Sequence, residues 1–114
     1  MLFCQPSLSS YPQAALAFID SETPAMEVAV RNKDRIYFVG ASERMKDFLE
    51  KWGALTDSAA THPYPMCTNT VTDFIIVGLC KIMPPGSICE PSTFFPKYEQ
   101  TVALCRAQNH SSAR

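Results

Sequence analysis

The clearest hydrophobic pattern in the chain lies over residues 43–53, and it predicts an amphipathic helix. Apolar side chains recur there at intervals of three and four residues, while charged side chains occupy the other side of the helix. Ser42 is suited to cap the start of this helix, and Gly53 is suited to the position where it ends. The apolar stripe consists of Met45, Phe48, Leu49 and Trp52. We expect this stripe to be buried, with the Trp52 ring in the protein core.

Residues 26–39 show the shorter period that is typical of β-strands. Large apolar side chains recur at every second position in the first half of this segment, and residues 36–39 are β-branched or aromatic. The polar residues 32–35 between them predict a turn, so we expect a β-hairpin. On a β-strand, this spacing places three apolar side chains on the same face, those of Met26, Val28 and Val30. An isolated hairpin is marginally stable in water, and the helix over residues 43–53 would cover its apolar face.

Three further helices are expected, near residues 12–19, 71–83 and 97–107. A cap-forming serine and a proline suit the start of the first helix, and residues 20–24 are typical of a turn that ends it. The second helix has a competing interpretation, because its β-branched residues favour a strand. Its apolar residues recur at helical spacing, and we adopt the helix on that ground.

These elements predict an α+β fold, in which the hairpin over residues 26–39 packs against the helix over residues 43–53. The chain has 114 residues, close to the usual size of one domain, and 46% of them are hydrophobic. We expect residues 1–107 to form a single globular domain. The polar residues 108–114 are expected to form a flexible C-terminal tail.

The five cysteines do not resemble a disulfide framework. Their number is odd, and their density is far below that of small disulfide-rich proteins. We therefore predict that most of them are reduced, with Cys80 and Cys105 as small buried hydrophobic residues. The longest apolar run is too short to cross a membrane, and the first residues lack the basic and apolar segments of a signal peptide. These features predict a cytoplasmic protein.

Charge and motif content argue against several functional classes. The net charge is −1 and there is no basic stripe, so we expect neither nucleic acid nor a membrane surface as a partner. The isolated glycines form no phosphate-binding loop, and no cofactor is predicted. No serine or cysteine nucleophile signature is found, so no catalytic residue is predicted. The cysteines lack the short spacing of zinc ligands, and no metal is predicted. A disfavoured but conceivable metal site would use His62, Cys67, Cys80 and Cys89.

Two proline-containing connections, near residues 62–67 and 84–96, remain as a candidate binding surface. Aromatic and methionine side chains supply much of the binding energy at protein interfaces. Those in the connections are Tyr64, Met66, Phe94 and Phe95. The sequence therefore favours a non-catalytic binding or regulatory protein that contacts another protein, or itself as a homodimer. The alternative is a ligand-binding protein or small enzyme with a pocket between hairpin and helix, and with His62 and Cys67 at its mouth.

Overall fold

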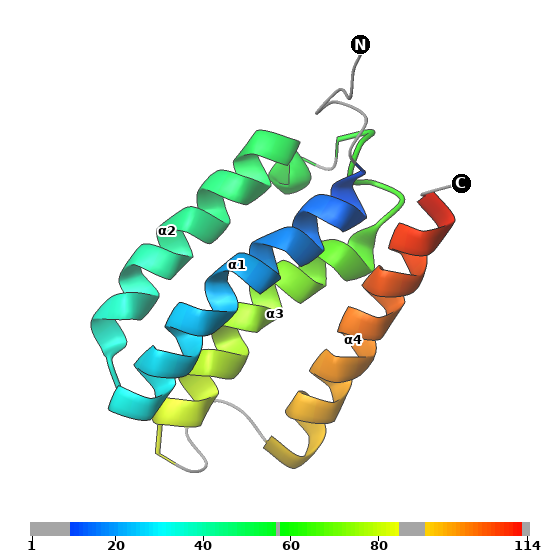
Figure 1. Ribbon diagram of the computed structural model, residues 1–114. Coiled ribbons are helices and arrows are strands. Elements are labelled where there is room, and N and C mark those ends of the chain that lie inside the picture. Colours follow the sequence, from blue (N-terminus) through cyan, green and yellow to red (C-terminus); the bar gives the residue numbers. More distant parts are fainter. Residues whose placement is uncertain (1–9, 57, 85–90, 113–114) are drawn as a thin grey trace.

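The computed structural model describes residues 10–56, 58–84 and 91–112, and this part of the chain is helical without any strand. Its α-helices are α1 (Tyr11–Asn32), α2 (Arg35–Trp52), α3 (Pro65–Ile82) and α4 (Pro91–Ser112), and the short 3-10 helix η2 (Ala54–Thr56) follows α2. Figure 1 shows a bundle in which α1 and α3 lie centrally, with α2 and α4 on opposite sides. Helices α1 and α3 contact each other and both flanking helices, so the core surrounds this central pair.

The β-hairpin predicted over residues 26–39 is wrong, and with it the α+β fold class. These residues form the end of α1, a turn and the beginning of α2. The turn does lie within residues 32–35. Lys33 adopts the left-handed backbone conformation with a φ of 54°, and Asp34 is the N-cap of α2. A carboxylate oxygen of Asp34 accepts a hydrogen bond from the Ile36 amide at 3.0 Å. The polar link therefore joins two helices and not two strands.

Helix α1 passes through Pro24, although the sequence predicts a turn there. A proline in a helix interior removes one backbone hydrogen bond and costs about 3 kcal/mol. The buried face nevertheless continues across the proline at helical spacing, from Ile19 to Met26. Next to the interrupted turn, the Thr23 hydroxyl donates a hydrogen bond to the Ile19 carbonyl at 2.7 Å. Burial on both sides of the proline outweighs its cost. Val28, which the strand pattern placed beside Met26, is 46% exposed.

The other three helices lie where the sequence predicts helices, but each begins earlier than expected. Helix α2 begins at Arg35, so Ser42 lies inside it and is not its cap. Gly53 follows the last residue of α2 with a φ of 73°, which confirms the predicted end. Helix α3 spans most of residues 71–83, where strand and helix were competing interpretations. Spacing decides between them, because α3 buries the side chains that recur every three or four residues.

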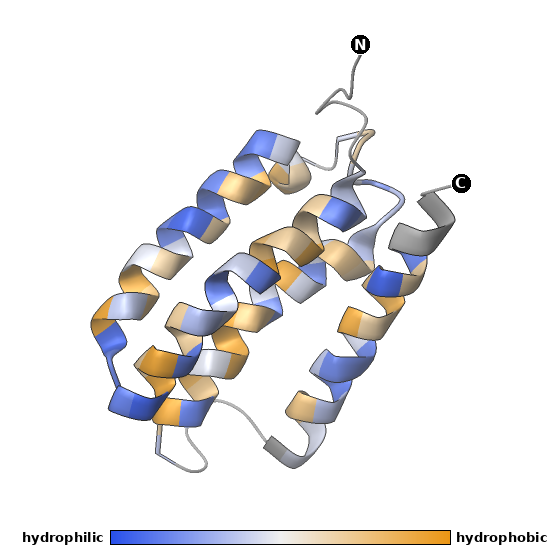
Figure 2. Ribbon diagram, viewed as in Figure 1, coloured by the Kyte–Doolittle hydropathy of each residue, from blue (hydrophilic) through white to orange (hydrophobic). Residues whose placement is uncertain are grey.

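The side chains between the helices form two apolar clusters. One includes Met26 and Phe38 near the turn between α1 and α2, and the other includes Tyr11 and Leu49 near the opposite end of α1. The Trp52 ring lies at the edge of the second cluster, 5.5 Å from the Tyr11 ring, and is only partly buried. Figure 2 shows hydrophobic positions along both central helices. The stripe predicted over residues 43–53 thus does face the core, but it covers helices in place of a hairpin.

Candidate functional site

A groove between α1, α3 and α4 is the candidate binding site. Its volume is about 230 Å³, and it lies toward the end of the bundle where α1 and α3 finish. Most of its wall is apolar, with Tyr98 contributed by α4 and with the charged residues Glu27 and Lys81 at the side. The apolar wall residues from α1 and α3 are Ile19, Met26, Phe74 and Val77. We refer to this space as the α1–α3–α4 groove.

A second hollow of about 300 Å³ continues the groove toward the ends of α1 and α3. Both spaces share Met26, Glu27 and Lys81, and the second is also lined by Val30 and Arg31. Arg31 lies in the last turn of α1 and Lys81 in the last turn of α3. We call this hollow the charged end of the groove. A single elongated molecule can therefore lie against apolar side chains at one end and basic side chains at the other.

At Gly78 of α3, side chains of α1 and α2 pack close against the helix backbone. A Cβ atom at this position would lie 2.6 Å from Cε of Met26 and 2.8 Å from a ring carbon of Phe38. Carbon atoms in contact are normally about 3.5–4.0 Å apart. Only a residue without a side chain lets Met26 and Phe38 pack directly on the α3 backbone here, and this contact sets the position of the groove wall.

Tyr98 contributes an uncharged side chain to the groove at neutral pH. Its pKa is raised to about 12, first by burial and then by the negative charge of Asp73. Burial also raises the pKa of the Asp73 carboxyl, while the positive charge of Lys97 acts in the opposite direction. Because Tyr98 carries no charge, the charged side chains that line the groove and its charged end are those of Glu27, Arg31 and Lys81.

A polar cluster links α1 to α2 outside the groove. Glu22 is only 8% exposed, and it accepts hydrogen bonds from the Tyr37 hydroxyl at 2.8 Å and from Nε of Arg44 at 2.6 Å. A second nitrogen of Arg44 donates to the same carboxylate at 3.0 Å. The hydrogen bonds from Arg44 lower the pKa of Glu22, and the smaller effect of Tyr37 adds to them against the opposing effect of burial. Because every group is paired, we assign this cluster a structural role.

Replacing Tyr37 by phenylalanine should lower stability in a pH-dependent way. Burial, followed by the hydrogen bond to Glu22, raises the pKa of Tyr37 from 10 to about 12. Because the pKa of Tyr37 is higher in the folded protein, the protonated hydroxyl stabilises the fold. Its contribution to the free energy of unfolding is complete below pH 10 and is lost as the pH rises toward 12. We expect Tyr37→Phe to cost about 1–2 kcal/mol at pH 8. Urea unfolding of both proteins from pH 8 to 12 should show the difference shrinking above pH 10, and a constant difference would contradict the assignment.

The four predicted binding residues do not lie on one surface. Tyr64 precedes α3 and Met66 lies in its first turn, and both are partly buried. Phe94 and Phe95 lie near the start of α4, with their ring centroids 6.4 Å apart, and the Lys81 ammonium at the end of α3 is 5.9 Å from the Phe95 ring. A helix of 18 residues is about 27 Å long, so the two pairs lie at opposite ends of α3.

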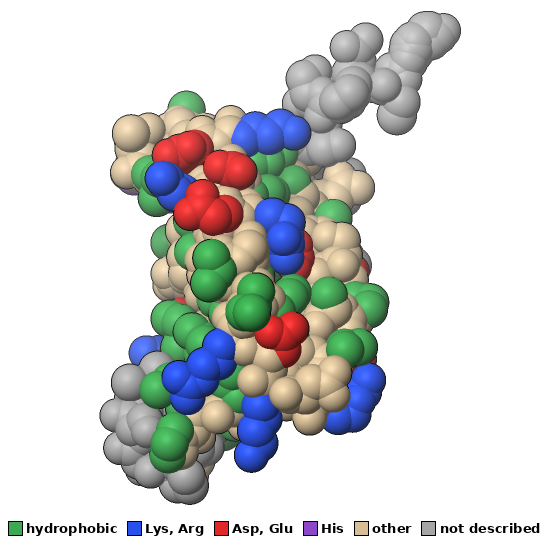
Figure 3. All heavy atoms as spheres, turned by 90° about the vertical axis from the view of Figure 1, so that its left-hand side faces the viewer, with side chains coloured by type: hydrophobic (Ala, Val, Ile, Leu, Met, Phe, Trp, Pro, Cys, Tyr) green, Lys and Arg blue, Asp and Glu red, His purple; other side chains and the backbone are tan. Residues whose placement is uncertain are grey.

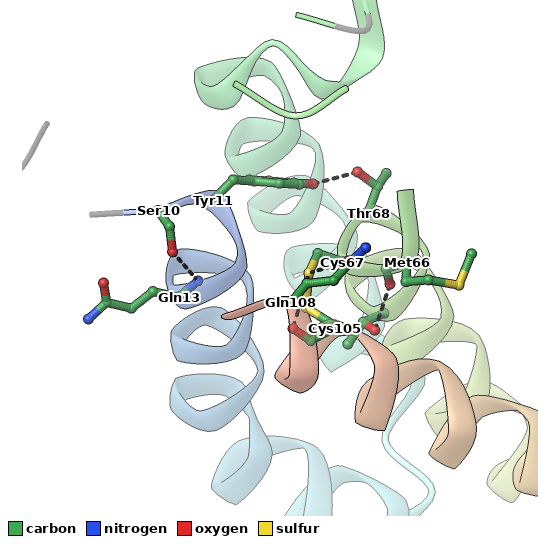
Figure 4. Close-up of a disulfide and its surroundings, with 9 residues drawn as sticks. Ser10, Tyr11, Gln13, Met66, Cys67, Thr68, Cys105 and Gln108 are labelled. Atoms are coloured by element: carbon green, nitrogen blue, oxygen red, sulfur yellow. Dashed lines mark hydrogen bonds between the residues drawn. A yellow bond between two sulfur atoms is a disulfide. The ribbon is translucent and has the colours of Figure 1, made fainter. Parts of the chain in front are cut away.

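The alternative pocket, with His62 and Cys67 at its mouth, loses one of its predicted walls. The hairpin that would have formed one wall does not exist, and His62 lies on the exposed surface before α3. Cys67 is completely buried and forms a disulfide with Cys105, which joins the start of α3 to the last part of α4 (Figure 4). Cys67 therefore offers no thiol for catalysis or ligand contact. Beside the disulfide, the Tyr11 hydroxyl and the Thr68 hydroxyl are 2.7 Å apart and hydrogen-bonded.

The prediction that most cysteines are reduced is also wrong. Besides Cys67 and Cys105, Cys80 is disulfide-bonded. The linked residues Cys67 and Cys105 are 38 positions apart, and only the antiparallel packing of α3 on α4 brings them together. Among the residues that the structure describes, no group of three or more histidine, cysteine or acidic side chains could hold a metal ion. Cys89, a member of the disfavoured metal set, lies outside the described residues.

Sequence reasoning missed most of the groove. Ile19 was placed in a short helix that ends before Pro24, and Met26 was placed on a strand. A signal was available, because Ile19 and Met26 are seven residues apart, which is two turns of one helix face. Lys81 and Tyr98 carried no comparable signal, since nothing in their spacing shows that they lie near α1.

Within the described residues, no helix combines the length and the apolar character that crossing a membrane requires. Comparison with known proteins adds no further guide to function: no family model, no curated protein sequence and no solved structure matches the chain.

Proposed function

We propose that the protein is a non-catalytic binding protein that holds an apolar ligand in the α1–α3–α4 groove. The observation that carries this proposal is the groove itself, in which Ile19, Met26 and Phe74 line a solvent-accessible space between three helices. Small-molecule sites in proteins are typically concave and mostly apolar, with a few polar groups that orient the ligand. The charged end, with Arg31 and Lys81, supplies such groups.

The chemistry of the groove favours binding over catalysis. Nucleophilic catalysis needs a hydroxyl or thiol next to a base that removes its proton. The Thr23 hydroxyl instead donates its hydrogen bond to the Ile19 carbonyl in its own helix. Tyr98 keeps its proton far above neutral pH, because its pKa is about 12. The preference for a non-catalytic protein and the prediction of no cofactor are therefore retained as part of the proposal.

We also propose that the protein works in an oxidising compartment. The cytoplasmic location expected from the sequence would keep the cysteines reduced, whereas Cys67 and Cys105 are bonded to each other. Disulfides persist in compartments such as the endoplasmic reticulum, the bacterial periplasm and the extracellular space, and they are rare in the cytosol. Counting free thiols in protein isolated from its native source tests this point, since a thiol reagent reacts with Cys67 and Cys105 only if their bond is absent.

Filling the groove should abolish binding of an apolar probe. We expect the neutral dye N-phenyl-1-naphthylamine to bind the native protein with one saturable site and enhanced fluorescence. Thr23 also lines the groove, so Thr23→Trp places a large ring in a space of about 230 Å³ and should weaken binding at least about ten-fold. Ala25→Trp is the matched control, because Ala25 lies on the exposed side of the same helix. Equal dye affinity in both variants, with both still folded by circular dichroism, would refute the groove as the site.

Self-association through α2 is a second candidate function, and it retains the predicted homodimer. Ile36 is 81% exposed and Val39 is 68% exposed, and both lie on α2. Figure 3 shows the α2 side of the molecule, where apolar side chains lie among charged ones. A symmetric dimer would bring the same patch of two copies together. Sedimentation velocity should then show a dimer that Val39→Glu converts to a monomer, and a native monomer at high concentration would exclude this candidate.

A further inference from the structure

We propose that the ligand of the groove is an unbranched, medium-chain monocarboxylate, with its chain in the α1–α3–α4 groove and its carboxylate beside Arg31 and Lys81. This inference rests on the proposed function and names its ligand class. The two adjoining spaces supply the reason for an amphiphile. Met26, Glu27 and Lys81 line both, so one molecule can extend from the apolar wall into the charged end.

The volume of the groove limits the length of the chain. The apolar part offers about 230 Å³ to water-sized groups, and one medium-length chain of methylene groups is on the order of this size. A chain of eight to ten carbons fills it and leaves the head group in the second hollow, whereas much longer chains would project into solvent.

The side chains at the charged end determine the head group. Arg31 and Lys81 both donate hydrogen bonds and accept none, so the head group must be an acceptor. A carboxylate matches the guanidinium group in both charge and geometry. Glu27 lines the same hollow, so the side chains contribute two positive charges and one negative charge. A monoanion balances this set, while a cationic head group would face two like charges.

The ring of Phe95 supports the position of the ammonium group. Lys81 Nζ lies 5.9 Å from the centroid of this ring, which belongs to the first turns of α4. The lysine stem therefore lies along the boundary between α3 and α4 and lines both parts of the groove. The Phe95 ring restricts the conformations of the Lys81 side chain before a ligand binds. Less conformational entropy of Lys81 is therefore lost on binding.

Arg31 and Lys81 have an ordinary structural explanation that the experiment must separate from ligand binding. Each lies in the last turn of its helix, where a cation offsets the partial negative charge of the helix end. On that explanation alone, neutralising both residues changes thermal stability and leaves ligand preference unchanged. The proposal requires a change in the preference between ligands that have the same chain and different head groups.

The test measures displacement of N-phenyl-1-naphthylamine at pH 8 by decanoate, 1-decanol and decyltrimethylammonium, each below its micellar concentration. We expect decanoate to bind about ten-fold more tightly than decanol, and decyltrimethylammonium to bind most weakly. Arg31→Gln combined with Lys81→Gln should weaken the binding of decanoate and bring decanoate and decanol to within about three-fold of each other. Lys46→Gln, at an exposed position on α2, is the matched control and should retain the full preference.

The outcomes separate this inference from the function on which it rests. Equal binding of decanoate and decanol by the native protein overturns the carboxylate inference, while dye displacement by both still supports the apolar groove. A double variant that keeps the preference for decanoate also overturns it, because the two cations then serve only the helix ends. Failure of the dye and all three amphiphiles to bind overturns the proposed function itself.

Discussion

Replacing Cys67 and Cys105 together by alanine should lower the free energy of unfolding by about 4 kcal/mol. The bond closes a loop between residues that are 38 positions apart, and this loop contains nearly all of α3 and the first part of α4. Without the bond, the unfolded chain gains the conformational freedom that the loop had removed. Both side chains are completely buried, so the loss of two sulfur atoms from the core adds to the effect.

Urea unfolding of the double variant and the native protein measures this difference. We expect the dependence of the free energy on urea to become steeper in the variant, because an unfolded chain without the cross-link exposes more surface. The steeper dependence distinguishes an effect on the unfolded state from a loss of native contacts alone. A difference below about 1 kcal/mol with an unchanged slope would contradict a structural role of the bond.

Phe38→Ala should be the most destabilising substitution within residues 36–39, with an expected cost of about 3–5 kcal/mol. Phe38 is only 4% exposed, and its ring packs on the α3 backbone at Gly78. Ile36 lies two residues earlier and is 81% exposed, because residues two apart lie on different faces of a helix. Ile36→Ala should therefore change stability by less than about 0.5 kcal/mol.

This pair of variants also distinguishes the helix from the predicted hairpin. On a β-strand, Ile36 and Phe38 point to the same face, and their substitutions would have similar effects. Thermal or chemical unfolding of the two single variants provides the comparison, with the native protein as reference. Similar losses in both variants would favour the strand, whereas a large loss confined to Phe38→Ala supports α2 as described.

The sequence predicts helices most reliably where an apolar stripe contains no charge and no proline. Residues 43–53 meet this condition, and their stripe does face the core of the bundle. The second half of α1 does not meet it, because Pro24 and the buried Glu22 interrupt the stripe. The Glu22 carboxylate tolerates burial only because Arg44 and Tyr37 reach it from another helix, which local spacing cannot reveal. After Pro24, apolar residues at every second position favour a β-strand locally. The packing of α1 against the other helices overrides this local preference.

The candidate site was less predictable than the fold. Its residues come from three helices, and the sequence gives no measure of how those helices pack. His62 and Cys67 were predicted to lie at the mouth of one pocket because they share one connection in the sequence. Cys67 instead lies in the core and is bonded to a residue of α4. Phe95 was predicted as a binding residue of a surface connection, and its neighbour Lys81 belongs to a different helix. Contacts between distant parts of the chain decide each of these positions.

The hydrogen bonds of Glu22 have a consequence for how α2 is aligned along α1. A slide of α2 along α1 by one helical turn, about 5.4 Å, would replace each side chain at the contact by one that lies three or four residues away. After such a slide, neither Arg44 nor Tyr37 could reach the carboxylate, and a buried charge without partners costs several kcal/mol. The hydrogen bonds of one acidic side chain thus favour the observed alignment of α2 over such a displaced one.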